Sequence, residues 1–361
     1  MIIITGSTGL IGSSASDHFL KKRNKIIGID NDLRSYFFGK NASNLWKQKI
    51  LIKNKLYKHF SLDIRNKDAV FSLFKKYSKK ITTIIHTAAQ PSHDWAAKEP
   101  FTDFHVNATG TLNLLEAFKT YCPKATFIFT STNKVYGDTP NFLPLKEKKL
   151  RFEISKNHSY YKKGINEKMS IDHTTHSLFG ASKTAADILV QEYGRYFNLK
   201  TVCFRGGCLT GENHSGAELH GFLSFLVKCI INNKKYSIFG YKGKQVRDNI
   251  HSSDVVKAFE HFMKNPKKGG KVYNLGGGRE NSCSILEVIK LIEQISKRKS
   301  RYKILKKNRI GDHLWWISDN SKFKKEYPKW KIEVSLKKSL QQMINFELDK
   351  NIKKNRKKIS I

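Results

Sequence analysis

The first twelve residues, MIIITGSTGLIG, constrain the fold of this chain more than any other stretch. An apolar run is followed by Gly6, Gly9 and Gly12 in a GxxGxxG spacing, and then by a helical pattern. Glycines at this spacing allow a tight turn from strand to helix, close approach of a pyrophosphate to the backbone, and close packing of the helix on the strand. The helix would present N–H groups and a partial positive charge to the phosphates. We therefore predict a dinucleotide-binding turn at residues 6–12.

The second strand, expected within residues 24–31, carries Asp30 at its end. An aspartate at this place can accept hydrogen bonds from both hydroxyls of an adenosine ribose, and it repels a 2′-phosphate. Arg34 could instead pair with such a phosphate, but Asp30 favours NAD over NADP as the cofactor. The alternative interpretation of Asp30 is a solvated acid at the end of a strand.

Strands and helices alternate through the first 210 residues. Further strands are expected within residues 59–66, 81–89, 125–132 and 200–211. Such alternation is typical of a parallel sheet with right-handed crossovers, buried on both faces. We predict an α/β fold, a doubly wound parallel Rossmann sheet with a smaller mixed α/β substrate lobe on its C-terminal side.

The predicted organisation has three parts. Residues 1–205 form the NAD-binding Rossmann domain, and residues 206–350 form mainly the substrate lobe, with about 245–280 returning to the Rossmann domain. Residues 351–361 form a basic tail, expected to be a frayed, solvated end. The segment 137–178 has no clear period, and a connection of that length is usually functional or contact-forming.

Composition bears on partners and location. Lysine and arginine number 67 against 30 aspartates and glutamates, which gives a net charge of +37. That excess favours anionic partners, but the lysines are scattered between motifs, so we expect a charged surface rather than a nucleic-acid site. No basic leader precedes the first strand, and no apolar run reaches about 18 residues. With five cysteines at no metal-like spacing, we expect a cytoplasmic protein without a membrane span.

No metal site is predicted. His214 and His220 with Glu212 and Glu218 could suggest one, but their spacing does not match a compact zinc pattern.

Eight motifs together point to one family. They are TGSTGLIG at the turn, DIRN at 63–66, HTAA at 86–89, NATGTLNLLEA from Asn107, STNKVYG at 131–137, FGASK at 179–183, and two stretches that contain Arg247 and Arg309, QVRDNIHSSDV and RIGD. Over nearly its whole length the chain resembles the extended short-chain dehydrogenase/reductase family, the nucleotide-sugar epimerases and dehydratases. Within that family it is most similar to the CDP-paratose and CDP-tyvelose 2-epimerases, on the basis of TNKVYGD and the long segment that follows.

The resemblance implies a set of site residues. For the cofactor they are Gly6, Thr8, Gly9, Leu10, Ile11, Gly12, Asp30, Asn31, Asp63, Ile64, Ala88, Ala89, Gln90, Asn107 and Lys183. For a nucleotide-diphosphate sugar, with a CDP-sugar favoured, they are Asn133, Arg247 and Arg309. Thr132 and Lys183 occupy catalytic positions. Dehydratases of the family carry an acid pair where this chain has Asn133 and Lys134, and without that acid the loss of water lacks its proton donor.

Such epimerases move a hydride from a sugar carbon to NAD and return it to the other face of the ketone. The hydroxyl must lose its proton as the hydride leaves, and the family uses a tyrosine four residues before the lysine. Here that residue is Phe179, which cannot carry a proton.

Three readings remain for a site without the tyrosine. A different group could accept the proton: Thr132, Tyr160, Tyr161 or His176, although His176 could equally be a surface residue at a helix entry. Lys183, desolvated beside NAD, could accept it instead. In the third, the protein binds its ligands without turning them over, which gives the rival function of a non-catalytic or nucleic-acid-binding relative.

The helices expected near 110–121 and 177–196 carry apolar residues on more than one face. A helix buried all round needs a partner beyond its own sheet, so we expect a homodimer. The alternative is that the segment 137–176 covers these helices.

Overall fold

The computed structural model describes residues 1–218, 220–306, 308 and 311–359, with side chains as far as residue 352. Its centre is a seven-stranded sheet in which every neighbouring pair is parallel. Across the sheet the strands are β12 (Lys271–Leu275), β8 (Lys200–Gly206), β5 (Thr126–Thr132), β4 (Thr83–His86), β1 (Ile2–Thr5), β2 (Ile26–Ile29) and β3 (Tyr57–Phe60). The predicted parallel α/β sheet is confirmed.

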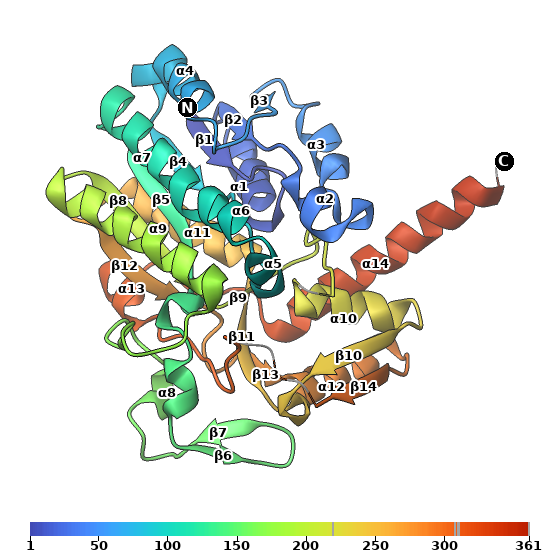
Figure 1. Ribbon diagram of the computed structural model, residues 1–361. Helices are drawn as coiled ribbons and strands as arrows, with labels where there is room; N and C mark the ends of the chain where they lie inside the picture. The colour runs from blue at the N-terminus through green and yellow to red at the C-terminus, as the bar shows by residue number, and fades with distance from the viewer. Residues whose placement is uncertain (219, 307, 309–310, 360–361) are drawn as a thin grey trace.

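Helices cover both faces of this sheet (Figure 1). On one face lie α4 (Lys67–Tyr77), α7 (Gly110–Tyr121) and α9 (Ser177–Tyr196), which pack against the sheet through residues such as Phe74, Phe118 and Val190. On the other lie α1 (Leu10–Lys21), α11 (Ser252–Lys264) and α13 (Ser321–Glu326). The inner strands of the sheet carry fully buried apolar residues such as Ile3, Ile84 and Phe127, because helices cover both of its faces.

A smaller lobe lies beyond the carboxyl ends of the strands. It holds the three-stranded sheet β13 (Ser282–Ser284), β11 (Val246–His251), β9 (Cys208–Thr210), and the parallel pair β10 (Lys235–Phe239) and β14 (Arg301–Leu305). Its core is closed by α10 (Phe222–Ile231), α12 (Ile285–Ser296) and α14 (Leu336–Ile359). The range predicted to return to the larger domain supplies α11 and β12, but the boundary at residue 205 stays a prediction.

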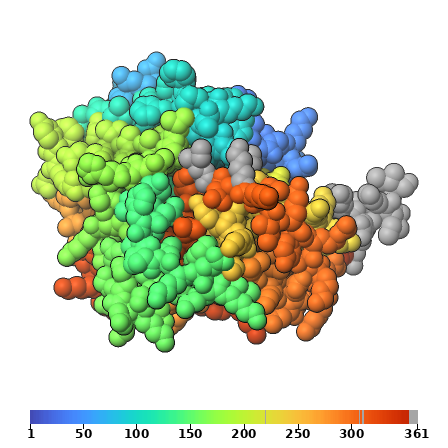
Figure 2. Space-filling view, turned by 60° about the horizontal axis from the view of Figure 1, so that its bottom comes forward, coloured from blue at the N-terminus to red at the C-terminus, as the bar shows by residue number. Residues whose placement is uncertain are grey.

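The long segment after β5 forms a separate arm. It contains the hairpin β6 (Leu145–Glu147) and β7 (Phe152–Ile154) and the short α8 (Tyr160–Lys163). Its apolar residues pack on Trp315 and Trp316 rather than on α7. Figure 2 shows the arm, in green, on the surface beside the orange C-terminal lobe.

Shorter helices line the approach to the sheet: α2 (Leu33–Phe38), α3 (Leu45–Leu51), α5 (His93–Lys98) and α6 (Pro100–Phe104). The backbone of α14 is helical as far as Ile359, and the expectation of a frayed, solvated end beyond residue 350 stays a prediction. Of the helices described, none combines the length and apolar character that crossing a bilayer requires.

Candidate active site

One cavity of about 470 Å³ runs from the glycine turn to the smaller lobe. Both predicted halves of the site lie on its wall: Gly6 and Asp30 at one end, Lys183 in the middle, and Arg247 at the other. These residues come from the loops at the carboxyl ends of β1, β2 and β5, from α9 and from β11. Ligands of open parallel sheets bind at this edge, so the fold itself gathers them.

The glycine turn has backbone segments so close together that side chains would not fit between them. Gly6 has φ +63°, and a Cβ on it would lie 2.8 Å from the backbone N of Ala88. A Cβ on Gly12 would lie 2.1 Å from the carbonyl oxygen of Gly6. Gly9 caps α1, and no side chain occupies the cap. The turn therefore brings the N-terminus of α1 to the cavity uncovered, which suits the pyrophosphate of a dinucleotide.

Asp30, predicted to bind the adenosine ribose, lines the cavity and has its carboxylate held by hydrogen bonds. One of its carboxylate oxygens accepts from the N–H and hydroxyl of Thr8, at 2.9 and 2.5 Å, and the other from the N–H of Asp32 at 2.9 Å. Thr8 and Gly12, predicted to contact the cofactor, are not on the described wall: Thr8 is buried and holds Asp30, and Gly12 packs α1 on the turn.

The position of Arg34, near Asp30, bears on the choice between NAD and NADP. The guanidinium of Arg34 donates to the carbonyl of Ser215 at 2.6 Å and to Nδ1 of His220 at 3.3 Å. Burial lowers its pKa to about 10. Because Arg34 is turned to this loop, the acid of Asp30 dominates the ribose end, and the residues present fit NAD.

Other residues that the sequence predicts to contact the cofactor lie near Asp30. Asn31, Asp63 and Ile64 lie on the cavity wall, as do Leu10 and Ile11 of the turn. Although burial opposes it, hydrogen bonds from Arg65 lower the pKa of the Asp63 carboxyl. Asp63 is thus a fixed carboxylate beside the pocket.

Ala88 and Ala89 lie on the wall, whereas Gln90 and Asn107 lie behind it. The side chain of Asn107 accepts from the backbone N–H of Gln90 at 2.9 Å and donates to its carbonyl at 3.0 Å. It also donates to the carboxylate of buried Asp103, and burial raises the pKa of that carboxyl to about 6. The prediction that Gln90 and Asn107 contact the cofactor is not supported, because they fix the loop that does the lining.

Lys183 lies at the middle of the cavity. Its ammonium donates to the carbonyl of Thr130 at 3.0 Å and stands 4.1 Å from the centre of the Phe129 ring. Burial lowers its pKa to about 8. Thr132, at the end of β5, lines the cavity beside it. A cation and a hydroxyl are thus placed for a nicotinamide ribose and a reacting sugar carbon.

The position of the missing tyrosine is on this wall. Phe179 lies one turn before Lys183 on α9, is 7% exposed, and has its ring edge against the ring of His93. His176 is outside the helix, and its Nε2 bonds the carbonyl of Val135 at 2.9 Å. His176, Tyr160 and Tyr161 are not among the described residues that line the cavity, which argues against all three as the proton acceptor.

The far end is polar and charged. Arg247 pairs with Asp312 at 2.5 Å, and Lys134 donates to the carbonyl of Gly311 at 2.9 Å and lies 3.4 Å from Asp312. Burial lowers the pKa of Lys134 to about 8, and the charges of Arg247 and Lys134 hold that of Asp312 well below its usual range. Asn133 also lines this end, while Arg309 falls outside the described residues. One net positive charge remains among these three groups.

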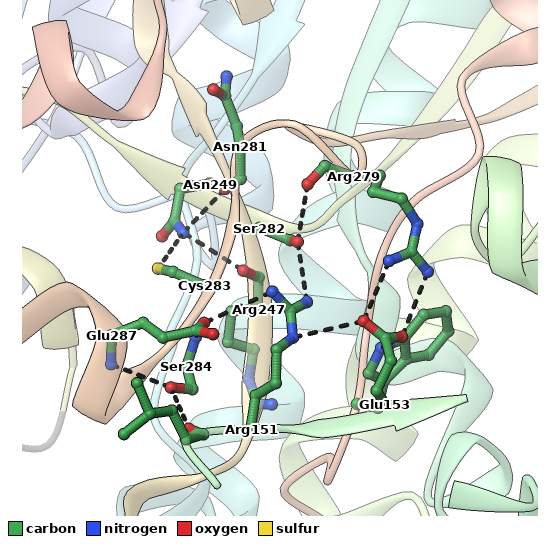
Figure 3. Close-up of polar contacts among 12 residues, drawn as sticks. Arg151, Glu153, Arg247, Asn249, Arg279, Asn281, Ser282, Cys283, Ser284 and Glu287 are labelled. Atoms are coloured by element: carbon green, nitrogen blue, oxygen red, sulfur yellow. Dashed lines mark hydrogen bonds and ion pairs between the residues drawn. The ribbon is translucent and has the colours of Figure 1, made fainter. Parts of the chain in front are cut away.

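The strand that carries Arg247 is braced from the arm. Arg247 stands opposite Cys283 of β13, and Arg151 of the arm reaches β13 by donating to Ser282 at 3.0 Å (Figure 3). The Oε2 atom of Glu153 forms ion pairs with Nε of Arg151 at 3.4 Å and with Nη1 of Arg279 at 3.0 Å. The arm predicted to be contact-forming thus buttresses the substrate end.

Several wall residues were not found from the sequence. They are His93, Lys134, Asp312, and the lobe residues Tyr236, Phe239 and Gln245. Lys134 and Asp312 are 178 residues apart, and although they lie in the motifs STNKVYG and RIGD, the sequence assigned no role to either side chain. Among the described residues, no group of three acids, histidines or cysteines could hold a metal ion.

Asp30→Ala is expected to weaken NAD binding by about tenfold or more, because a charge-assisted hydrogen bond contributes roughly 1.5–3 kcal/mol. Calorimetry on protein stripped of nucleotide measures it. Asp68→Ala, in the first turn of α4, is the control and should leave the affinity unchanged. Equal affinity in Asp30→Ala and the native chain would remove the assignment.

Comparison with known proteins identifies one family and similar relatives. The family model described as NAD dependent epimerase/dehydratase family matches residues 2–276. The CDP-paratose 2-epimerase of Salmonella typhi is 32% identical over 352 residues, 96% of this chain and 98% of that protein. The UDP-glucuronate 4-epimerase of Thermodesulfobacterium geofontis is 28% identical, over 97% of this chain and 98% of the other.

Among solved structures, a similar one is UDP-glucuronic acid 4-epimerase from Bacillus cereus in complex with UDP-glucuronic acid and NAD. It has a TM-score of 0.78 and 24% identity, and the match covers 96% of this chain and 99% of that one.

Proposed function

The chain belongs to the NAD-dependent epimerase/dehydratase family, and within that family we propose that it is a nucleotide-sugar epimerase that inverts carbon 2 of a CDP-sugar. The observation that carries this proposal is the single cavity that joins the glycine turn, Lys183 and Arg247. NAD, the cofactor of this family, supplies reversible hydride transfer when bound. The chain supplies the positions of the ligands and the path of one proton.

Each end of the cavity has its part in the proposal. The N-terminus of α1 and Asp30 hold the dinucleotide, while Lys183 holds the nicotinamide ribose and keeps a positive charge near the reacting carbon. Arg247 and Lys134 attract the diphosphate of the sugar nucleotide. Asn133 and Lys134 replace an acid pair, which favours epimerisation over loss of water.

Two observations support cytosine as the base. The first is the 32% identical relative, named as a CDP-paratose 2-epimerase. The second is Gln245, which lines the lobe end near Tyr236 and Phe239. Its Nε2 donates to the carbonyl of Phe239 at 3.3 Å, and its Oε1 has no hydrogen-bond partner among the described residues. An amide acceptor matches the 4-amino group of cytosine rather than the 4-oxygen of uracil.

The experiment that tests the function is incubation of the purified protein with CDP-sugars and with UDP-sugars, followed by NMR of the sugar products. We expect a 2-epimer from a CDP-sugar. A 4-epimer from a UDP-sugar would refute both the base and the carbon. Phe179 favours one rival, a protein that binds NAD and nucleotide without turnover, and the absence of any product would favour that rival.

We propose a homodimer formed through α7 and α9, which lie side by side on the outer face (Figure 1). Exposed apolar residues on this face include Phe104, Leu112, Ile188 and Tyr196. The apolar residues of the arm pack elsewhere, so the arm does not bury this group.

A cytoplasmic location also stays a prediction.

The dimer predicts a mass by light scattering of about twice 41.6 kDa at micromolar concentration. Ile188→Glu should give the monomer mass, because a charge in an apolar interface is costly. Phe142→Glu, an exposed phenylalanine on the arm, is the matched control and should not change the mass. A monomer in the native chain would exclude the dimer.

A further inference from the structure

We propose that His93 accepts the proton of the reacting sugar hydroxyl in place of the absent tyrosine, and that Ser177 positions its ring. The inference rests on the proposed function, because it assigns the one proton that epimerisation must move. It is carried by the contact between three side chains: Phe179, His93 and Ser177.

His93 lies beside the ring that lacks the hydroxyl. It is the first residue of α5, a helix that packs against α9. Its imidazole lines the same cavity as Phe179 and Lys183. The centres of the His93 and Phe179 rings are 5.0 Å apart, and the rings meet at 68°. An imidazole therefore stands beside the phenyl ring that lacks a proton-carrying atom.

Ser177 holds this ring from the start of α9. Its Oγ lies 2.7 Å from Nδ1 of His93 and also accepts from the N–H of Gly180 at 3.2 Å. Ser177 has φ +60°, a left-handed conformation that is unfavourable for a non-glycine residue. A hydroxyl oxygen has two lone pairs, so Oγ can accept from both Gly180 and Nδ1–H. In that tautomer Nε2 carries the lone pair that can take a proton.

The charged groups of the wall are poorer acceptors. The ammonium of Lys183 donates to Thr130 and faces the ring of Phe129, and that of Lys134 donates to Gly311 beside Asp312. These contacts favour the protonated lysine, and a pKa of about 8 leaves both mainly charged at neutral pH. The carboxylate of Asp312 is paired with Arg247. Imidazole is the side chain whose ordinary pKa is nearest neutrality.

The step balances without an external reagent. The sugar hydroxyl gives its proton to Nε2 of His93 as the hydride leaves the same carbon for bound NAD, and the C–O single bond becomes a carbonyl. After the ketone has presented its other face, the hydride returns to carbon and the imidazolium returns the proton to oxygen. His93 is neutral again, and the cofactor has its starting oxidation state.

The first test compares the native chain with His93→Gln and with the double variant His93→Gln/Phe179→Tyr, all loaded with NAD. Loss of a positioned base typically costs about 10²–10⁴ in rate, so His93→Gln should lower kcat by that factor with little change in KM. The double variant should recover at least about tenfold, because a tyrosine beside Lys183 restores a proton-transfer group. Free imidazole should partly restore His93→Ala. His173→Gln, an exposed histidine, is the control.

The second test uses readouts other than turnover. Calorimetry should give His93→Gln the native affinity for CDP, because the proposal assigns the ring to the sugar hydroxyl and not to the nucleotide. Nitrogen NMR should show His93 in the Nδ1–H tautomer in the native chain and a mixture in Ser177→Ala. Ser177→Ala should lower kcat about tenfold and leave KM unchanged, as expected of a positioning residue acting through His93.

The outcomes separate this inference from the function itself. A native chain that neither reduces bound NAD nor releases a 2-epimer would refute the proposed function. Native turnover with full kcat in His93→Gln would overturn His93 alone. So would a loss of kcat in His93→Gln that the added tyrosine does not relieve, together with a loss in His93→Ala that imidazole does not relieve, because those results indicate a purely structural residue.

Discussion

Lys183→Met is expected to lower kcat by roughly 10³-fold or more, the largest effect of any single side chain in the site. Methionine keeps an apolar stem against the ring of Phe129, but it removes the ammonium that donates to Thr130. The loss combines the anchor of the nicotinamide ribose with the positive charge nearest the developing alkoxide. Steady-state kinetics on NAD-loaded protein measures it.

The control for this change is Lys75→Met, an exposed lysine of α4, which should keep native kcat. The pKa of about 8 adds a second signature. Burial lowers the pKa, so the ammonium is the main form below pH 8 and is lost above it. If the ammonium is the working form, kcat should fall as the pH rises through about 8. Activity in Lys183→Met near the native level would contradict its role.

Gly12→Ala should abolish NAD binding within the measurable range and destabilise the fold. The new Cβ would lie 2.1 Å from the carbonyl oxygen of Gly6 and 2.9 Å from Cα of Ser7. Those are backbone atoms of the turn itself, so relief requires α1 to move away from the phosphate site. Overpacking of this kind costs about 1–3 kcal/mol or more. Calorimetry gives the affinity, and thermal unfolding gives the stability of protein stripped of NAD.

Gly9→Ala is the matched comparison, because a Cβ there would lie 3.3 Å from the same carbonyl oxygen at an ordinary φ. We expect weaker NAD binding, since Gly9 lines the cavity, with a much smaller loss of melting temperature. Equal melting temperatures for Gly12→Ala and the native chain would show that the turn can open without cost.

The parts of the molecule set by local rules were predictable. The run Ile2–Thr5 and the glycines after it make a buried strand and a tight turn whatever follows, so β1, α1 and the ribose acid Asp30 were found. The alternation that follows allows few arrangements other than a parallel sheet covered on both faces. Lys183 and Thr132 were placed by the family resemblance, through the motifs FGASK and STNKVYG.

The parts of the molecule set by long-range contacts were not predictable from the sequence. His93 meets Ser177 across 84 residues, and neither segment carries a pattern that names the other. His176 was considered as a base because it precedes Phe179 by three residues. Residues three apart share a face only when both lie inside a helix. Helix α9 begins at Ser177, so His176 lies outside it and turns to Val135.

Gln90 and Asn107 show a related limit. Both belong to motifs near the site, yet their side chains bond the loop from behind and leave the wall to Ala88 and Ala89. A motif marks a position in the fold, and burial then decides whether a side chain reaches a ligand or supports its neighbour.

The central claim is that the protein inverts carbon 2 by taking and returning a hydride through its own NAD. A CDP-sugar that carries deuterium at carbon 2 tests this directly, with the product followed by mass spectrometry and NMR in ordinary water. The account predicts a 2-epimer that keeps its deuterium at carbon 2, with transient absorbance of the reduced cofactor. A product that has exchanged the label for solvent hydrogen, or bound NAD that stays fully oxidised with every sugar, would contradict it.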